Sequence, residues 1–567
     1  MRVEKNFGVR AGVTAAGAAV ALFVFGAGPV RAQTAPAGRV APSAAVVSIP
    51  PQPQEPVRRL SINEAVALAL EQNIDLQVDR IDPQLQDLSV AVARSGWTPA
   101  FFSNLQTRSQ SNPTTDIFGG AASLTNDNLT SQAGVQQLLP WGGGNYTAFF
   151  NSGRSETSNI FSTFNPQLSS SLGFNYTQPL LRNFTIDATR QQVLVSRKNR
   201  EISDVQLNQS IAATTRNVKN AYWDLVFAIN NLAVQRQSLQ LAQQSFRDNR
   251  ARVEIGTMAP LDIVQAEAEV AQREESVILA EAAIQAREDA LRALISNPAD
   301  QPEFWNTRLE PADLPNFEPI AVDVEAAVRT ALANRTDLAT TRKQLEANDI
   351  SIRYFRNQSL PDVNALVNYS AFGLAGTRLE LTPGLNPTII SQSPRGFGGA
   401  LGDIFGSDYP SWSMQLQVNY PIGASSAEGN LARARLQDSQ ARKRLQGTEL
   451  QVTTQIRSFA RNVTTNAKRV EATRASRALA QKRLEAEEKK FTAGMTSSFL
   501  VIQAQRDLSN ARNNELQAII DYLKSVVDFE TSQQAPLGGG GGGLVQTGQQ
   551  QQSQQQNQQQ NQQQQQQ

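Results

Sequence analysis

Apolar residues recur at every seventh position along a long stretch of the first half of the chain. They are Val218, Leu225, Leu232, Leu239, Phe246 and Val253. A seven-residue apolar repeat is typical of a coiled-coil helix. Neither proline nor glycine interrupts the chain between Asp187 and Val253. We predict one helix there, on the order of 100 Å long at a rise of about 1.5 Å per residue.

This long helix is predicted to form one arm of a hairpin. Gly256 follows its end, where glycine commonly closes a helix, and a shorter helix returns at roughly Leu261–Ile295. The second half has the same arrangement, with a long helix at about 430–491, Gly494, and a return helix at roughly Phe499–Phe529. We therefore expect two long helical hairpins.

Each return helix would cover only about half of its long partner. A second short helix, at roughly Gln84–Ser95 in the first half and Leu338–Asn357 in the second, is long enough to cover the remainder. The helical part is thus predicted to be a tall wall of paired helices.

Polar and apolar residues alternate in the segments that precede the long helices. Met414, Leu416, Val418 and Tyr420 are separated by polar residues, and the same alternation occurs at 363–369 and 172–176. This pattern suits a membrane-spanning strand, which needs about 9–11 residues, or a half-buried strand of a soluble sandwich. Because the strands lead directly into very long helices, no compact sheet partner is left for them, which favours the membrane.

We count four such strands per chain, too few to close a useful membrane barrel. Open strand edges are not tolerated in lipid, so the barrel must be shared, and three chains would give twelve strands. The segment Gly134–Arg154 also predicts an additional hairpin around Trp141–Asn145. Whether this hairpin adds strands to the barrel or folds outside it stays open.

The two halves repeat one another in order. LSINEAVALALEQNIDL at Leu60–Leu76 is echoed 262 residues later by VDVEAAVRTALANRTDL at Val322–Leu338, and Gly256 and Gly494 lie 238 residues apart. We infer a tandem duplication of one large unit. Its expected parts are a first unit at 60–317 with strands at about 97–178 and a hairpin at about 187–295, and a second unit at 318–530 with strands at about 361–421 and a hairpin at about 430–529.

The two ends of the chain predict segments outside these units. Residues 1–32 have a basic start, an apolar stretch and a small-residue cleavage site, as expected of a signal peptide. Residues 33–59 form a linker rich in proline and alanine, and 531–567 a tail rich in glycine and glutamine, which we expect to be disordered. The role of the tail stays open.

Composition restricts the chemistry that the chain can perform. The 567 residues include neither cysteine nor histidine, so most metal sites and most pairs of a nucleophile with a base are excluded. Without the signal peptide, 48 Lys and Arg would face 50 Asp and Glu, which gives no electrostatic basis for binding nucleic acid. We expect no enzyme activity, no cofactor and no metal.

Taken together, these segments resemble the TolC-type outer-membrane efflux proteins, from Leu60 to about Glu530. The matching features are the duplicated opening phrase, the strand-to-helix phrase YTQPLLRN at Tyr176–Asn183, and the two glycine turns. The resemblance implies an α+β membrane protein: a homotrimeric outer-membrane β-barrel continuous with a long periplasmic α-helical coiled-coil barrel. It also implies action with an inner-membrane pump, of RND, ABC or MFS type, and with a periplasmic adaptor protein.

The resemblance also points to particular residues. Sites that contact the adaptor would fall on the two turns: Gly256, Thr257, Met258, Ala259, Gly494, Met495, Thr496 and Ser497. Members of the family carry acidic residues just after the second turn, where this chain has Leu500 and Gln503. Asp262, after the first turn, keeps an acid and is the candidate for the periplasmic constriction, or else simply an acidic residue in the first turn of its helix.

The predicted function is therefore an exit duct in the outer membrane of a Gram-negative bacterium, passively exporting substrates in an efflux or type I secretion system. The alternative is a structural or adhesive coiled-coil protein of the cell surface or periplasm. An adhesin would not need strands of membrane-spanning length. The exported substrate and the class of pump stay open, because selectivity resides mainly in the pump.

Overall fold

The computed structural model describes residues 57–113, 123–296, 305, 307–384, 387–423 and 425–537. The predicted signal peptide, most of the predicted linker and the tail beyond 537 lie outside these ranges. Two predicted boundaries need correction. The linker ends before β1 (Val57–Leu60), which pairs in parallel with β6 (Arg308–Pro311). The last helix runs beyond Phe529 to Ser532, whose hydroxyl donates to the Phe529 carbonyl.

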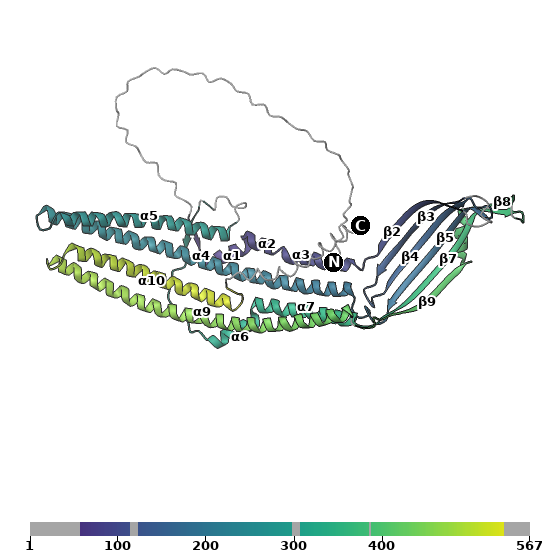
Figure 1. Ribbon diagram of the computed structural model, residues 1–567. Coiled ribbons are helices and arrows are strands. Elements are labelled where there is room, and N and C mark those ends of the chain that lie inside the picture. Colours follow the sequence, from purple (N-terminus) through teal and green to yellow (C-terminus); the bar gives the residue numbers. More distant parts are fainter. Residues whose placement is uncertain are drawn as a thin grey trace, which may run out of the picture. The chain divides into compact units, whose positions relative to one another are not determined.

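Two long helical hairpins dominate the chain (Figure 1). The first consists of α4 (Ala188–Glu254) and α5 (Leu261–Ile295), the second of α9 (Ser426–Thr492) and α10 (Ser498–Ser532). The two long helices have 67 residues each and the two return helices 35 each. Side chains of Asp187 and Ser425 cap the long helices by accepting from backbone N–H groups of the first turn. The predicted hairpins are confirmed.

Shorter helices contact the long ones. They are α1 (Ile62–Gln72), α2 (Ile74–Asp79), α3 (Asp82–Ser95), α6 (Val324–Asn334) and α7 (Thr336–Gln358). Helix α3 packs on α4, and α7 packs between α4 and α9. Both lie along the parts of the long helices near the strands, while α5 and α10 lie along the other parts (Figure 1). The predicted second short helix in each half is therefore confirmed.

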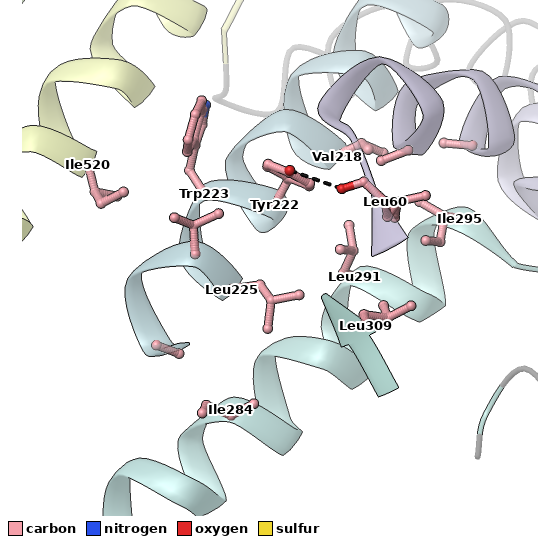
Figure 2. Packing of buried hydrophobic residues seen from close by; sticks show 14 of the residues in the cluster. Leu60, Val218, Tyr222, Trp223, Leu225, Ile284, Leu291, Ile295, Leu309 and Ile520 are labelled. Atoms are coloured by element: carbon pink, nitrogen blue, oxygen red, sulfur yellow. Dashed lines mark hydrogen bonds between the residues drawn. The ribbon is translucent and has the colours of Figure 1, made fainter. Parts of the chain in front are cut away.

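The largest apolar cluster joins α1, α4, α5 and the β1–β6 pair (Figure 2). At its centre Tyr222 is fully buried; its hydroxyl donates to the Leu60 carbonyl at 3.0 Å and bonds the Asp313 carboxylate at 2.9 Å. Burial raises the pKa of the Tyr222 phenol well above its ordinary value. The side chain therefore stays protonated and connects α4 to Leu60 at the end of β1 and to Asp313 just after β6.

The strands form one antiparallel sheet in the order β2, β3, β4, β5, β7, with β8 and β9 both pairing to β7 at different heights. Their bounds are β2 (Ala100–Pro113), β3 (Ser123–Leu138), β4 (Asn145–Thr157), β5 (Phe164–Pro179), β7 (Asp362–Leu381), β8 (Ile389–Arg395) and β9 (Pro410–Asn419). A short helix, α8 (Phe397–Gly406), packs against β7 at Gly373.

The prediction of four strands per chain is wrong. Six long strands lie side by side, because the predicted hairpin around Trp141–Asn145 joins the middle of the sheet as the β3–β4 connection. Strand β2 then pairs with β3 along 14 residue pairs. The distal halves of β2 and β3 are rich in Ser, Asn, Gln and Thr, so they show no apolar alternation, and their backbone pairing had no signal in the sequence.

Candidate functional site

One face of the sheet is apolar from edge to edge. Across the six strands, one row of directly paired residues consists of Phe101, Val135, Ala148, Phe174, Tyr369 and Trp412. The two residues at the ends of this row are exposed to solvent: Phe101 is 72 % and Trp412 77 % exposed. Farther along the same face, a row of serines crosses the three strands β3, β4 and β5, at Ser131, Ser152 and Ser170. An exposed apolar row that reaches both edges of a sheet still marks a surface that is covered by protein or lipid.

The opposite face is mainly polar. The next row along the same strands reads Gln136, Thr147, Asn175, Asn368 and Ser413. On this face, aromatic rings also lie over glycines of the neighbouring strands. The Phe149 ring lies where a side chain on Gly173 would be, and Phe102 occupies the same place at Gly134. Sheets use aromatic rings in this way to fill the gap above a glycine.

The apolar face ends in polar and aromatic side chains. Near the helices, the Tyr146 hydroxyl donates to Gln137, whose amide donates to the Trp97 carbonyl, both at 2.8 Å. At the far end of β4, Arg154 pairs with Glu156. Between these limits β5 contributes about ten residues, which at a strand tilt of about 40° span about 25 Å. This height matches the apolar band of membrane strands.

Both predicted turns close their helices in the same way. Gly256 has φ +76° and Gly494 has φ +74°. In the first turn the Gly256 N–H donates to the Val253 carbonyl and the Thr257 N–H to the Arg252 carbonyl, and the second turn repeats this pattern. These paired bonds define the Schellman motif, which needs a left-handed residue. In the described part of the chain, no atom lies within 4 Å of a Cβ built on either glycine, so both turns face open space.

The remaining turn residues differ in exposure. Thr257, Ala259, Met495 and Ser497 are exposed, and Met258 and Thr496 are half-buried. Met495 is 76 % exposed. The two turns are adjacent, because the Arg252 guanidinium lies over the Phe491 ring at 4.3 Å. The structure thus brings the eight predicted turn residues together at the neighbouring ends of the two hairpins.

Asp262 links the two hairpins. Its carboxylate accepts a hydrogen bond of 2.9 Å from the hydroxyl of Ser498, the first residue of α10 and a buried one. Leu500 and Gln503, at the positions where the resemblance implied acids, are both exposed. Asp262 is therefore placed at the contact between α5 and α10, beside the turns.

A charged cluster farther along the same contact was not predicted. Glu269 of α5 is 3 % exposed and accepts from Arg273 and from Arg506 of α10, each at 2.7 Å. The Glu269 carboxylate raises the pKa of the Arg506 guanidinium above its ordinary value. This contact could not be predicted from the sequence, because a glutamate on a charged helix has the appearance of a solvated residue.

The described residues contain no helix with both the length and the apolar character to cross a membrane. In the same part of the chain, no cluster of acidic side chains is placed to hold a metal ion. The apolar sheet face is the candidate for contact with the membrane, and the helices carry the candidate docking turns. A sheet with one lipid-compatible face, continued by long helical hairpins, defines the class of outer-membrane channels with a helical extension.

Comparisons with solved structures agree with this class. The chain resembles CusC, described in connection with transmembrane channel formation (13 % identity, 84 % of this chain and 92 % of that chain, TM-score 0.61). It also resembles the VceC outer membrane protein of Vibrio cholerae (14 %, 83 % and 96 %, 0.57) and the CmeC outer membrane channel of Campylobacter jejuni (17 %, 83 % and 85 %, 0.55). At these identities the likeness shows the fold.

The family model of the outer membrane efflux protein matches residues 145–297 and 327–532. This is more than half of the chain, which therefore belongs to the outer membrane efflux protein family and confirms the TolC-type resemblance. The match begins at β4, so that β2 and β3 lie outside it. No curated protein sequence matches the chain.

Proposed function

We propose that the protein is the outer-membrane exit duct of a tripartite efflux or type I secretion system in a Gram-negative bacterium. It would passively conduct substrates that an inner-membrane pump delivers through a periplasmic adaptor. The observation that carries the proposal is the apolar row from Phe101 to Trp412, which runs across all six long strands on a face bounded by polar groups about 25 Å apart. No enzymatic step is assigned to the chain.

The working form is proposed to be a homotrimer. In one copy, β2 and β9 leave unpaired backbone groups along the two edges of the sheet, and such edges are not tolerated in lipid. Closure by three copies would give a barrel of eighteen strands in place of the twelve expected from the sequence. The equal lengths of α4 and α9, and of α5 and α10, support a tandem duplication.

Cysteine pairs test this assembly directly, because the chain has no cysteine of its own. Leu105→Cys in β2 is combined in turn with Trp412→Cys, Met414→Cys or Leu416→Cys in β9. At least one pair should produce a covalent trimer on oxidation and leave single-channel conductance in planar bilayers intact. The matched control replaces the β9 cysteine by Phe150→Cys in the interior strand β4, which should give no inter-chain product.

A stable monomer that inserts and conducts would refute both the trimer and the shared barrel. A trimer that remains soluble without detergent and does not enter bilayers would refute the membrane assignment. That second result would favour a structural coiled-coil protein of the cell surface or periplasm.

The two turns are the proposed docking site for the adaptor. They are adjacent, carry the exposed Met495, and have free space around Gly256 and Gly494. Gly494→Trp places a bulky side chain on a left-handed residue and should weaken adaptor binding and export at unchanged trimer yield. Gly494→Asn is the matched control, because asparagine tolerates this conformation. Export that survives Gly494→Trp combined with Gly256→Trp would reduce the turns to simple connections.

Asp262 is proposed to contribute to the periplasmic constriction. In a trimer three copies would surround the axis, and rings of carboxylates favour cations. Asp262→Asn should then lower cation preference and relieve block by multivalent cations in planar bilayers. Its bond to Ser498 supports a second role, holding α5 against α10. If only that role exists, the variant will lose some stability and keep its ion selectivity.

A further inference from the structure

A cavity of about 620 Å³ lies where the helices meet the sheet. Its walls come from Trp97, between α3 and β2, from the first turns of α4 and from the end of α7. One part of the lining is apolar and consists of Trp97, Ile186, Val193, Leu194 and Leu360. The other part carries four arginines, Arg190, Arg197, Arg353 and Arg356. The cavity therefore has an apolar wall on one part and several positively charged side chains on the other.

Only one of the four arginines is neutralised. Arg190 pairs with Asp187 at 2.7 Å and donates to the carbonyls of Asn183, Phe184 and Thr185. Among the described residues, the guanidinium groups of Arg197, Arg353 and Arg356 have neither a carboxylate within 4.0 Å nor a hydrogen bond. Three unpaired positive charges around one cavity leave it complementary to an anion.

The depth of these arginines fits a lipid headgroup layer. Along their helices, Arg190 and Arg356 lie about 3 Å, Arg353 about 8 Å and Arg197 about 14 Å from the helix ends that join the strands, at about 1.5 Å per residue. The headgroup layer on each side of a bilayer is about 5–8 Å deep. If the apolar sheet face spans the hydrocarbon core, Arg190, Arg353 and Arg356 are at the height of the phosphates of the periplasmic leaflet, and Arg197 lies about one helical turn beyond them.

One wall of the cavity is attached to the side of the sheet that would face lipid. Gln137 shares its face with Tyr146 and Tyr176, in the row next to Phe174 and Trp412. From this apolar face the Gln137 amide donates to the Trp97 carbonyl at 2.8 Å. Trp97 is thus anchored on the lipid side, and it lines the cavity.

We propose that this cavity binds an anionic phospholipid of the periplasmic leaflet, with the phosphate between Arg197, Arg353 and Arg356 and an acyl chain against Trp97 and Leu360. Arginine is suited to phosphate because its planar group donates two parallel hydrogen bonds. Basic pockets at the height of the headgroups recognise acidic lipids. The proposal rests on the proposed function, since it needs the sheet to be embedded in a membrane.

The test uses the full-length trimer purified in mild detergent and mixed with defined lipids. Native mass spectrometry should show that the protein retains phosphatidylglycerol or cardiolipin several-fold more than phosphatidylcholine. Retention should fall at least tenfold in the triple variant Arg197→Gln, Arg353→Gln, Arg356→Gln. The matched control is Arg461→Gln, an exposed arginine in the middle of α9 without an ion pair among the described residues, which should retain lipid as the parent does.

Several outcomes would overturn the proposal. The first is that the protein retains phosphatidylcholine as well as it retains the anionic lipids, and the second is that the triple variant retains as much lipid as the parent. The third is that inorganic phosphate, added at the same concentration as the lipid, displaces the bound lipid. If the triple variant no longer forms trimers and the parent protein retains no lipid, a neighbouring copy of the chain fills the cavity instead. Conductance in planar bilayers is measured in parallel. Normal conductance without lipid selectivity refutes the lipid site and leaves the channel assignment standing.

Discussion

Placing an arginine on each face of one strand is the most direct test of the sheet's orientation. Phe174 of β5 lies on the apolar face, stacked on Tyr146 with ring centroids 6.1 Å apart. Asn175 is its neighbour in sequence but lies on the polar face between Thr147 and Asn368. Phe174→Arg and Asn175→Arg therefore add the same charge at the same depth on opposite faces.

The expected difference follows from the position of Phe174 in the apolar band. It is two residues from Tyr176, which pairs with Tyr146 at the periplasmic limit of the band, about 5 Å along the membrane normal at a tilt of about 40°. This lies between the interface and the middle of a band about 25 Å tall, where an arginine facing lipid costs about 1–2 kcal/mol. The effect on insertion is then about 5- to 30-fold per chain, and a trimer carries the cost three times.

The assay is folding of the urea-denatured chain into phospholipid vesicles, scored by protection from protease and by migration as a trimer. Phe174→Arg should shift the folding midpoint to much lower urea, and Asn175→Arg should fold nearly as the parent does. Equal damage from both changes would show that both faces are buried in protein. Greater damage from Asn175→Arg would reverse the assignment of the two faces.

Three further predictions concern the helices. Tyr222→Phe removes the hydroxyl from the Leu60 carbonyl and the Asp313 carboxylate, but each keeps a backbone N–H donor. The change should therefore lower the free energy of unfolding by only about 0.5–1.5 kcal/mol in thermal melts. Hydrogen bonds from Lys343 and Lys198 hold the pKa of Glu201 below its ordinary value of 4.5. The ionised Glu201 therefore contributes its full stabilising effect above pH 4.5 and loses it on further acidification. Thermal melts of Glu201→Gln should show a weaker loss of stability in acid than melts of the parent. Arg506→Gln removes one partner of the buried Glu269, and amide exchange in the first turns of α10 should increase, whereas Arg512→Gln should leave it unchanged.

The helical part of the fold was predictable because its signals are local. The seven-residue repeat from Val218 to Val253 and the absence of glycine or proline fix α4, and the glycines at 256 and 494 fix both turns. A left-handed residue at a helix end depends on the neighbouring backbone alone. Spacing along the chain was therefore enough to place both hairpins.

The width of the sheet was not predictable, because strand pairing is not local. Ser103–Pro113 of β2 has little apolar alternation, yet its backbone pairs residue by residue with β3. The hairpin at Trp141–Asn145 was predicted from the sequence. The position of this hairpin in the sheet, however, depends on the pairing of β5 with β7, whose paired residues are almost 200 positions apart in the chain. A count of strands made from amphipathic segments therefore misses those whose two faces are both polar.

The same limit applies to the charges at the ends of the hairpins. From the sequence, Asp262 is an acid at the start of a helix, and that position alone suits either a gate or a helix-stabilising role. The structure adds Ser498 as its partner and, about two helical turns farther along α5, adds Arg506 as the partner of Glu269. Both bonds join α5 to α10, so separating these helices must break a neutral–charged bond at Asp262 and an ion pair at Glu269. Any opening that moves the two return helices apart should therefore become easier in Arg506→Gln, which removes the ion pair, and in Asp262→Asn, which weakens the bond to Ser498.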